Sequence, residues 1–263
     1  MTDQLFLLFA GGLLAGALGG LLGIGGGIVL MPMLRFMVGL SPAHAAGTCI
    51  LAVSFTTLGG SYRHYRLGHV NPRSILAIIV SGALATVVFS LIFVSLTARE
   101  RWLDLGMGLV FSLVSIRMIA AGIPGFLKER SGESPDSVIG GTLGGKIAIG
   151  AAGGMLPGLL GIGTGGVLVP GLSFFLGASI KTAVASSLTC FCFNAFISSA
   201  FKLAQGFIEK DVILPICLGT FIGANFGAML NRRFPPRAIK TIFGFFFSYV
   251  SLKFILLFFG VAI

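Results

Sequence analysis

The chain has 263 residues, of which 56% are hydrophobic and only 10% are charged. Soluble domains carry about 25% charged residues, so a single soluble core could not hide this much apolar surface. The formal net charge of +10 suits basic loops on the cytoplasmic side of a membrane, and no soluble part remains that could bind nucleic acid. Composition therefore predicts an all-α polytopic membrane protein.

The first apolar stretch, residues 5–37, is too long to be one simple span. As a single helix it would measure about 50 Å at 1.5 Å per residue, which exceeds a hydrocarbon core of roughly 30 Å. Gly23, Gly25, Gly26 and Gly27 lie in its middle and supply a break, because glycine adopts backbone conformations that a helix forbids. We expect a broken or re-entrant helical hairpin here.

The second half of the chain repeats the first. The segment LGGLLGIGGGIVLMP (18–32) aligns with LPGLLGIGTGGVLVP (156–170) at an offset of 138 residues, with the proline and most glycines in register. The sequence thus predicts one transmembrane repeat at 1–123, a cytoplasmic linker at 124–140 and a second transmembrane repeat at 141–263. In each repeat three spans follow the glycine-rich segment: 42–61, 74–97 and 102–122, then 182–203, 212–231 and 238–260.

Basic residues indicate how the repeats are oriented. If both glycine-rich segments are re-entrant, eleven basic residues lie inside and five outside: Arg63, Arg66, Arg73, Lys128, Arg130, Lys146, Lys181, Arg232, Arg233, Arg237 and Lys240, against Arg35, Arg99, Arg101, Lys202 and Lys210. The positive-inside rule favours this arrangement, whereas full crossings give an equal split. Hairpins leave three crossings per half, so we expect two inverted repeats with both termini outside.

The breaks are the first candidate for a substrate site. Freed backbone groups in a membrane need partners, so the breaks should meet inside the protein. Helices that begin just after them would present N–H groups and positive dipole ends to an anion. In the second copy the corresponding residues are Gly161, Gly163, Thr164 and Gly165. The alternative is that the glycines only allow close helix packing.

Two cations in the last span of each half are the second candidate. Arg117 and Lys253 end the matching segments GLVFSLVSIR and GFFFSYVSLK, and both are expected well inside the membrane. No aspartate or glutamate lies clearly within a span, so an anionic substrate is their natural counter-charge. Thr48, Ser186 and Asn194 add uncharged polar groups. The alternative is that the two cations extend to the nearer interface.

Other chemistry has little support. The four cysteines, Cys49, Cys190, Cys192 and Cys217, lie in apolar runs and suit packing, although a transmembrane dithiol carrier remains an alternative. The histidines have no carboxylate or cysteine beside them, so no metal site is predicted. We expect neither an enzyme nor a cofactor.

The glycine-rich motifs resemble those of a known family. LGIGGGIVLMPML (22–34), AAGTCI (45–50) and LGIGTGGVLVP (160–170) are similar to the sulfite exporter TauE/SafE family, also known as toluene-sulfonate uptake permeases. The resemblance implies transport of small sulfur-containing anions such as sulfite, sulfonates or sulfoacetate, by a multi-pass protein of the bacterial inner membrane. Its partners would be the anion, the lipid bilayer and, in one option, a second copy in a homodimer.

Direction and mode of transport are separate questions. An inside-negative potential drives anions outward, so export needs no coupled ion and is the expected direction. An anion channel is the remaining alternative, since it would differ in gating more than in the chemistry of its site.

Overall fold

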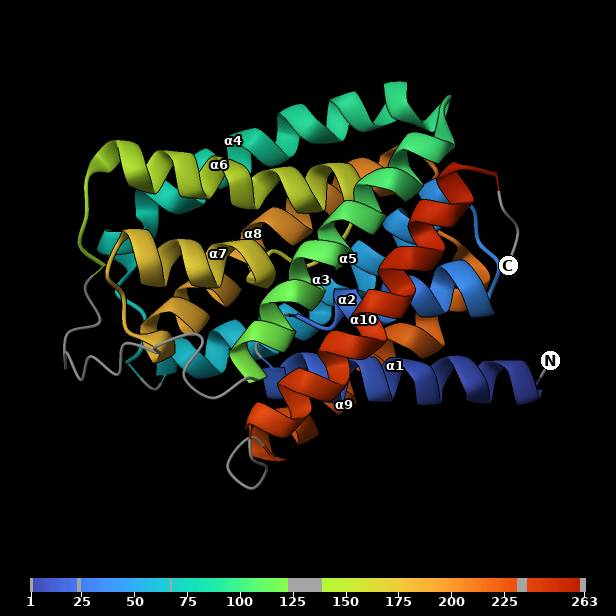
Figure 1. Ribbon diagram of the computed structural model, residues 1–263, viewed down its shortest axis with the longest axis horizontal. Helices are drawn as coiled ribbons and strands as arrows, with labels where there is room; N and C mark the ends of the chain where they lie inside the picture. The colour runs from blue at the N-terminus through green and yellow to red at the C-terminus, as the bar shows by residue number, and fades with distance from the viewer. Residues whose placement is uncertain (1, 23–24, 67, 123–138, 231–235, 261–263) are drawn as a thin grey trace.

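The computed structural model describes residues 2–22, 25–66, 68–122, 139–230 and 236–260. Within these residues the regular structure is entirely helical, which confirms the predicted all-α class. The elements are α1 (Thr2–Leu22), α2 (Gly27–Pro32), η1 (Met33–Met37), α3 (Pro42–Arg66), α4 (Pro72–Thr97), α5 (Glu100–Gly122), α6 (Leu143–Leu160), α7 (Gly165–Pro170), η2 (Gly171–Phe175), α8 (Ile180–Ala204), α9 (Lys210–Leu230) and α10 (Pro236–Phe258). The beginning of α1 and the end of α10 lie at the same end of the molecule (Figure 1).

The first glycine-rich segment turns back on itself. Gly26 has φ of 74°, a left-handed conformation in which glycine is favoured, and it begins the short helix α2. A Cβ on Gly19 would collide with the backbone of Gly26, and one on Gly11 would collide with the side chain of Met33. Residues early in α1 therefore face residues late in the segment, so α2 and the π-helical η1 run antiparallel to α1.

The second glycine-rich segment has the same form. Gly161 ends α6 with φ of 66°, and α7 begins four residues later. A Cβ on Gly153 would press on Leu168, and one on Gly171 would lie 3.0 Å from Ile149. The later residue of α6 thus faces the earlier residue of the returning segment, so α7 and η2 run antiparallel to α6. Figure 1 shows that α1 and α6 enter the molecule from opposite ends.

The two halves interlock. α1 packs along α9, α6 along α4, α3 along α8 and α5 along α10, so each close helix pair joins one half to the other. Glycines make the approach close: a Cβ on Gly16 would collide with the backbone of Thr220, and one on Gly154 with the carbonyl of Gly82. Small residues at helix interfaces are typical of membrane proteins. Neither half encloses a core by itself.

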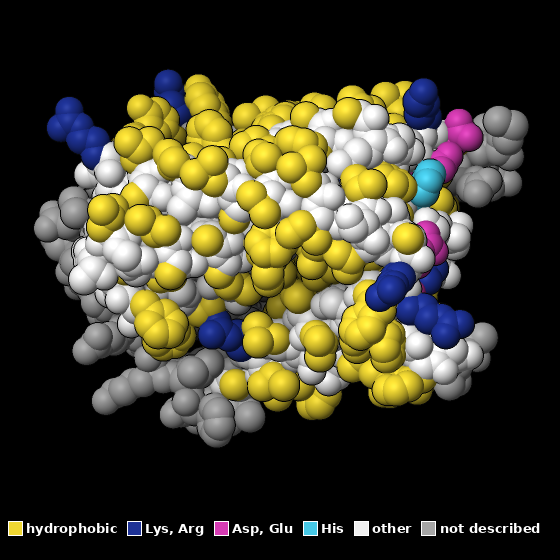
Figure 2. Space-filling model, turned by 90° about the horizontal axis from the view of Figure 1, so that it is seen from above, with side chains coloured by type: hydrophobic (Ala, Val, Ile, Leu, Met, Phe, Trp, Pro, Cys, Tyr) yellow, Lys and Arg dark blue, Asp and Glu magenta, His cyan; other side chains and the backbone are white. Residues whose placement is uncertain are grey.

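The outer surface is apolar over much of its area. Four helices among the described residues are long and apolar enough to cross a membrane: α4, most of α5, α6 and most of α8. Large exposed side chains such as Leu84, Leu109 and Phe245 face outward. In the face shown in Figure 2, apolar side chains are spread along the whole length of the molecule, and lysine and arginine lie mainly towards its two ends. This surface is that of a multi-pass membrane protein.

Three expectations need comment. Helix α3 continues past the predicted end at residue 61, so Arg63 and His64 lie in its last turns. Lys202 was counted as an outside loop residue, and this is wrong, because it lies within α8 and is fully buried. Most of the predicted linker, and Gly23, lie outside the described residues.

Candidate functional site

The two helix breaks meet near the middle of the protein. A Cβ on Gly27 would lie 3.1 Å from the backbone nitrogen of Gly163, and one on Gly161 would collide with the carbonyl of Ala46 in α3. Thr164, in the second break, is fully buried and its hydroxyl has no hydrogen-bond partner. The two glycine-rich breaks thus meet at Gly27 and Gly163, and the unpartnered hydroxyl of Thr164 comes from the next residue.

A small cavity lies beside the first break. Its volume is about 40 Å³, which is room for roughly three water molecules or one small solute. The lining residues come from α1, the first break, α3, α8 and α9: Gly19, Gly25, Thr56, Gly59, Gly60, Arg63, His64, Leu188, Phe221, Ala224 and Asn225. Of the residues predicted as a site, only Gly25 lines it.

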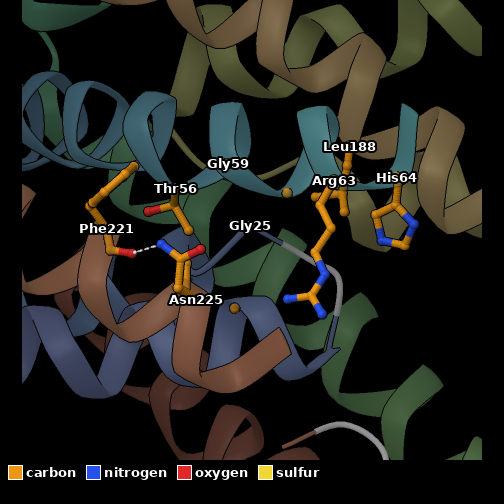
Figure 3. Close-up of a pocket in the computed structure, with 11 residues that line it drawn as sticks. Gly25, Thr56, Gly59, Arg63, His64, Leu188, Phe221 and Asn225 are labelled. Atoms are coloured by element: carbon orange, nitrogen blue, oxygen red, sulfur yellow. Dashed lines mark hydrogen bonds between the residues drawn. The ribbon is translucent and has the colours of Figure 1, made fainter. Parts of the chain in front are cut away.

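The polar groups of this cavity favour an anion. Figure 3 shows Arg63 and His64 extending from α3, with Asn225 and Phe221 on the facing helix α9. The Asn225 side chain donates a hydrogen bond to the Phe221 carbonyl at 2.9 Å, which fixes its orientation. None of the lining residues is acidic. A guanidinium and an imidazole without a carboxylate beside them can offer several donors to an oxyanion.

Of the polar residues predicted as a site on α3 and α8, one makes a hydrogen bond between helices and two have a polar atom without a partner. The hydroxyl of Thr48 accepts a hydrogen bond from the backbone N–H of Glu209 at 3.0 Å, so it ties α3 to the start of α9. Ser186 and Asn194 are buried, and the hydroxyl of the first and the amide oxygen of the second have no partner. Asn194 faces Gly82 of α4, away from the cavity lining.

Arg117 and Lys253 lie on the α5–α10 pair. Arg117 is exposed on the outer side of α5. The ammonium of Lys253 lies 5.4 Å from the ring centroids of both Phe36 and Tyr249, which are cation–π distances. Neither residue lines the cavity. The cavity lining thus does not include the two cations that the sequence singled out.

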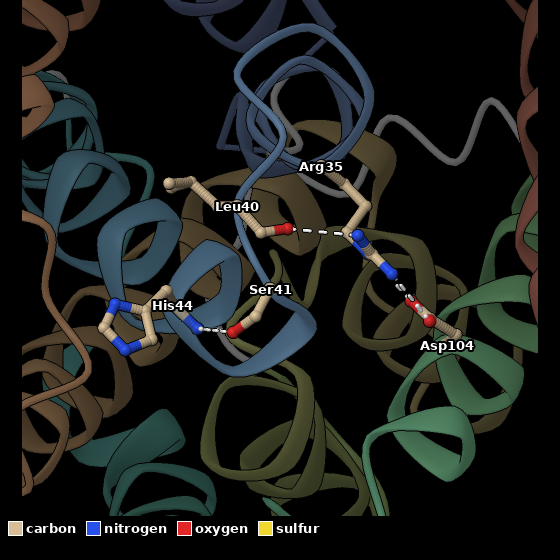
Figure 4. A network of polar contacts seen from close by, with 5 residues as sticks. All are labelled: Arg35, Leu40, Ser41, His44 and Asp104. Atoms are coloured by element: carbon tan, nitrogen blue, oxygen red, sulfur yellow. Dashed lines mark hydrogen bonds and ion pairs between the residues drawn. The ribbon is translucent and has the colours of Figure 1, made fainter.

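One buried ion pair has a structural role. Arg35 of η1 donates to both carboxylate oxygens of Asp104, at 3.1 and 2.9 Å, and also to the carbonyl of Leu40 at 3.1 Å (Figure 4). The paired geometry satisfies a carboxylate that is 4% exposed. It fastens the end of the first hairpin to α5, and it leaves neither charge free for a solute.

Sequence reasoning missed three basic residues that the structure makes prominent: Arg63, His64 and Lys202. Arg63 and His64 lie beyond the predicted end of the span 42–61, and Lys202, although inside the predicted span 182–203, was counted with the loop charges. The repeat contained a usable signal, because an offset of 138 residues places His64 and Lys202 at equivalent positions.

The cysteines are packing residues in this structure. Cys49, Cys190 and Cys192 are buried, Cys217 is partly buried, and all four are free thiols. The Cys49 thiol lies 3.6 Å from the carbonyl of Gly27, beside the first break. Among the described residues no group of three or more histidine, cysteine or acidic side chains could hold a metal ion.

Broken helices that meet inside a bundle of apolar helices, next to a small cationic cavity, define a multi-pass membrane transporter. Residues 8–254 match the model of the family described as sulfite exporter TauE/SafE, and the chain belongs to that family. This confirms the resemblance seen in the sequence. The family is one of membrane transporters and is not an enzyme class.

Relatives in other organisms carry transporter names. A probable membrane transporter protein of Haemophilus influenzae is 28% identical, covering 92% of this chain and 94% of its own length. The probable membrane transporter protein YunE of Bacillus subtilis is 25% identical over 88% and 90%. Sulfite exporter TauE/SafE family protein 2 of Arabidopsis thaliana is 42% identical over a shorter region, 26% of this chain and 15% of that protein. No solved structure matches the chain.

Proposed function

We propose that the protein transports small sulfur-containing anions, such as sulfite and sulfonates, across the bacterial inner membrane, and that it exports them. The observation that carries the proposal is the cavity beside the meeting point of the two breaks, with Arg63 and His64 in its lining and no acidic residue. Family membership and the names of the relatives support the substrate class.

The size of the cavity suits this class of solute. Sulfite and the head of a sulfonate are compact oxyanions, comparable in size to a few water molecules, and the cavity volume is about 40 Å³. Arg63 supplies a planar set of donors and Asn225 an amide, while Leu188 and Phe221 supply apolar contact. The mixture fits an oxyanion with a small organic substituent as well as sulfite itself.

Inverted repeats supply a route across the membrane. The α1–α2 hairpin and the α6–α7 hairpin enter from opposite ends, and their tips meet at Gly27 and Gly163. Two such repeats can rock against each other around a fixed central site, which opens it to one side at a time. We place the cavity on the cytoplasmic side, because its lining reaches Arg63, in the basic end of α3.

Export follows from energetics. Each anionic charge that leaves an inside-negative cell releases about 2.3 kcal/mol per 100 mV. Efflux driven by the membrane potential therefore needs no coupled ion.

Proteoliposomes test this function. Vesicles loaded with radiolabelled sulfite receive an inside-negative potential from valinomycin and a potassium gradient, with no sodium or proton gradient. Efflux should rise with the potential, saturate with internal sulfite and be absent from protein-free vesicles. Efflux that needs a sodium or proton gradient would contradict potential-driven export, and non-saturating flux would favour an anion channel.

A further inference from the structure

Lys202 is an unusual residue for a membrane helix. It lies near the end of α8 and its side chain is 0% exposed. Its ammonium donates to the carbonyl of Gly158 at 2.7 Å and lies 3.9 Å from the ring centroid of Phe93. The hydroxyl of Ser198 is 3.5 Å away, a long contact, and that hydroxyl itself donates to Pro157. An ammonium has three N–H donors, and here they meet only neutral groups: a carbonyl, a hydroxyl and a ring face.

No acidic side chain compensates this charge. Among the described residues the ion pairs are Arg35–Asp104 and His44–Glu209, and Lys202 belongs to neither. A buried charge without a counter-charge costs several kcal/mol, which a merely structural side chain could avoid by being apolar. Ser90 lies against Gly158, and its hydroxyl is buried without a partner. The ammonium of Lys202 and the backbone of Ser90 thus both lie against Gly158.

This region is the counterpart of the cavity in the other repeat. The 138-residue offset pairs three residues around the ammonium with three that line the cavity: Lys202 with His64, Ser198 with Gly60, and Pro157 with Gly19. Helices α3 and α8 run antiparallel, with Ser54 hydrogen-bonded to Ser199 at 2.9 Å and Ser61 to Thr189 at 3.1 Å. The two equivalent regions therefore lie towards opposite ends of the molecule. One is open as a cavity, and the other is filled by the lysine side chain.

We propose that Lys202 binds the transported anion on the far side of the breaks from the cavity, exchanging the carbonyl of Gly158 for an oxygen of the anion. In the structure the ammonium lies against the last turn of α6 and fills this end of the path. An oxyanion that passes the breaks would draw the ammonium away from that carbonyl and would supply the counter-charge that the described side chains around it lack. This role rests on the proposed function, and it makes Lys202 a substrate-binding residue of the transport path.

Two substitutions separate this role from simple capping of α6. Lys202→Gln keeps a donor for the Gly158 carbonyl but removes the charge, and Lys202→Met removes both. Lys181→Met is the matched control, since Lys181 is an exposed lysine of the same helix. Sulfite binding is measured by the rise in melting temperature of purified protein, and transport by efflux from proteoliposomes.

Both Lys202 variants should bind sulfite at least tenfold more weakly and transport it at least tenfold more slowly, while Lys181→Met matches wild type. If Lys202→Gln binds and transports like wild type, Lys202 only caps α6 and the proposal is overturned. If the wild type binds none of sulfite, sulfonates and sulfate, the proposed function fails and this role fails with it. The two failures are therefore distinguishable.

A measurement on the wild-type protein tests the same proposal if the Lys202 variants do not fold. Lys202 is the one fully buried lysine among the described residues, so in protein labelled with ¹⁵N at the lysine ammonium its resonance should be the one protected from water exchange. Titration with sulfite should shift that resonance, whereas a protected resonance unmoved by saturating sulfite would overturn the proposal.

Discussion

Arg63 places a positive charge in the lining of the cavity. It lines the cavity from α3, whereas Arg117 is exposed on α5 and lines no part of it. Arg63→Gln should weaken sulfite binding about threefold to tenfold, since a charge-assisted hydrogen bond is lost from a partly solvated position. Arg117→Gln is the matched control and should bind like wild type.

Isothermal titration with sulfite measures both variants. The reverse ranking, with Arg117→Gln the weaker binder, would restore the site expected from the mid-span cations. Equal losses in both would indicate that long-range attraction, and not contact, sets the affinity, and raising the salt concentration should then abolish the difference from wild type.

The cysteines supply a second prediction at this scale. Because Cys49, Cys190 and Cys192 are buried and none of the four is paired, the partly exposed Cys217 has no second accessible thiol with which to form a disulfide. A variant with Cys49, Cys190, Cys192 and Cys217 all changed to alanine should keep at least half of the wild-type efflux rate per folded molecule. Complete loss of efflux by a variant that elutes and melts like wild type would support the dithiol carrier.

Reasoning from the sequence predicted the contact between the two breaks but misplaced Lys202. The identities of Gly27 and Gly163 in aligned motifs were enough to predict that the breaks meet. Lys202 was misplaced because a hydropathy count treats every lysine as exposed to water. Its partners, Gly158 and Phe93, lie on other helices that are distant in sequence. A contact that joins α4, α6 and α8 leaves no local signal in the sequence.

At the scale of helices, close packing of α6 on α4 can be tested with two glycines of one helix. A Cβ on Gly154 would collide with the backbone of Gly82, while one on Gly144 meets nothing within 4 Å. Gly154→Ala should lower the free energy of unfolding by about 1–3 kcal/mol through overpacking. Gly144→Ala should raise it by roughly 0.5–1 kcal/mol, because alanine is the better helix former.

Unfolding in mild detergent, followed by circular dichroism over a denaturant series, compares the two variants with wild type. If Gly154→Ala raises the unfolding midpoint as Gly144→Ala does, helix propensity outweighs packing at this interface. The comparison also reports on the glycine-rich composition, which the sequence alone left open between helix breaks and close packing.

The sequence predicted well where a long apolar stretch must be divided into two helices. Arithmetic on residues 5–37 required a break, and the structure has one between α1 and α2. The π-helical turns η1 and η2 were not predicted. Each follows a proline, Pro32 or Pro170, whose missing N–H disturbs the hydrogen-bond ladder. Which irregular turn replaces the ladder depends on the helices packed around it.

At the scale of the whole molecule, orientation in the membrane is testable. In a variant without cysteine, Arg66→Cys places a thiol at the end of α3 and Arg99→Cys one between α4 and α5, and both positions are exposed. From the positive-inside rule, an impermeant maleimide should label Arg99→Cys in intact cells and Arg66→Cys only after the cells are opened. A permeant maleimide should label both. Labelling in the opposite order would place the cavity on the outer side and reverse the proposed direction.

The interlocking of the halves has a consequence for biosynthesis. Helix α1 ends at Leu22, and its partner α9 begins at Lys210. At about 5–20 residues per second, the ribosome delivers α9 roughly 10–40 s after α1 is complete. During that interval the glycine face of α1, shaped to receive another backbone, is covered only by lipid or by the insertion machinery. A chain that stalls after its first half would leave this face uncovered, and it should be recognised and degraded by membrane proteases.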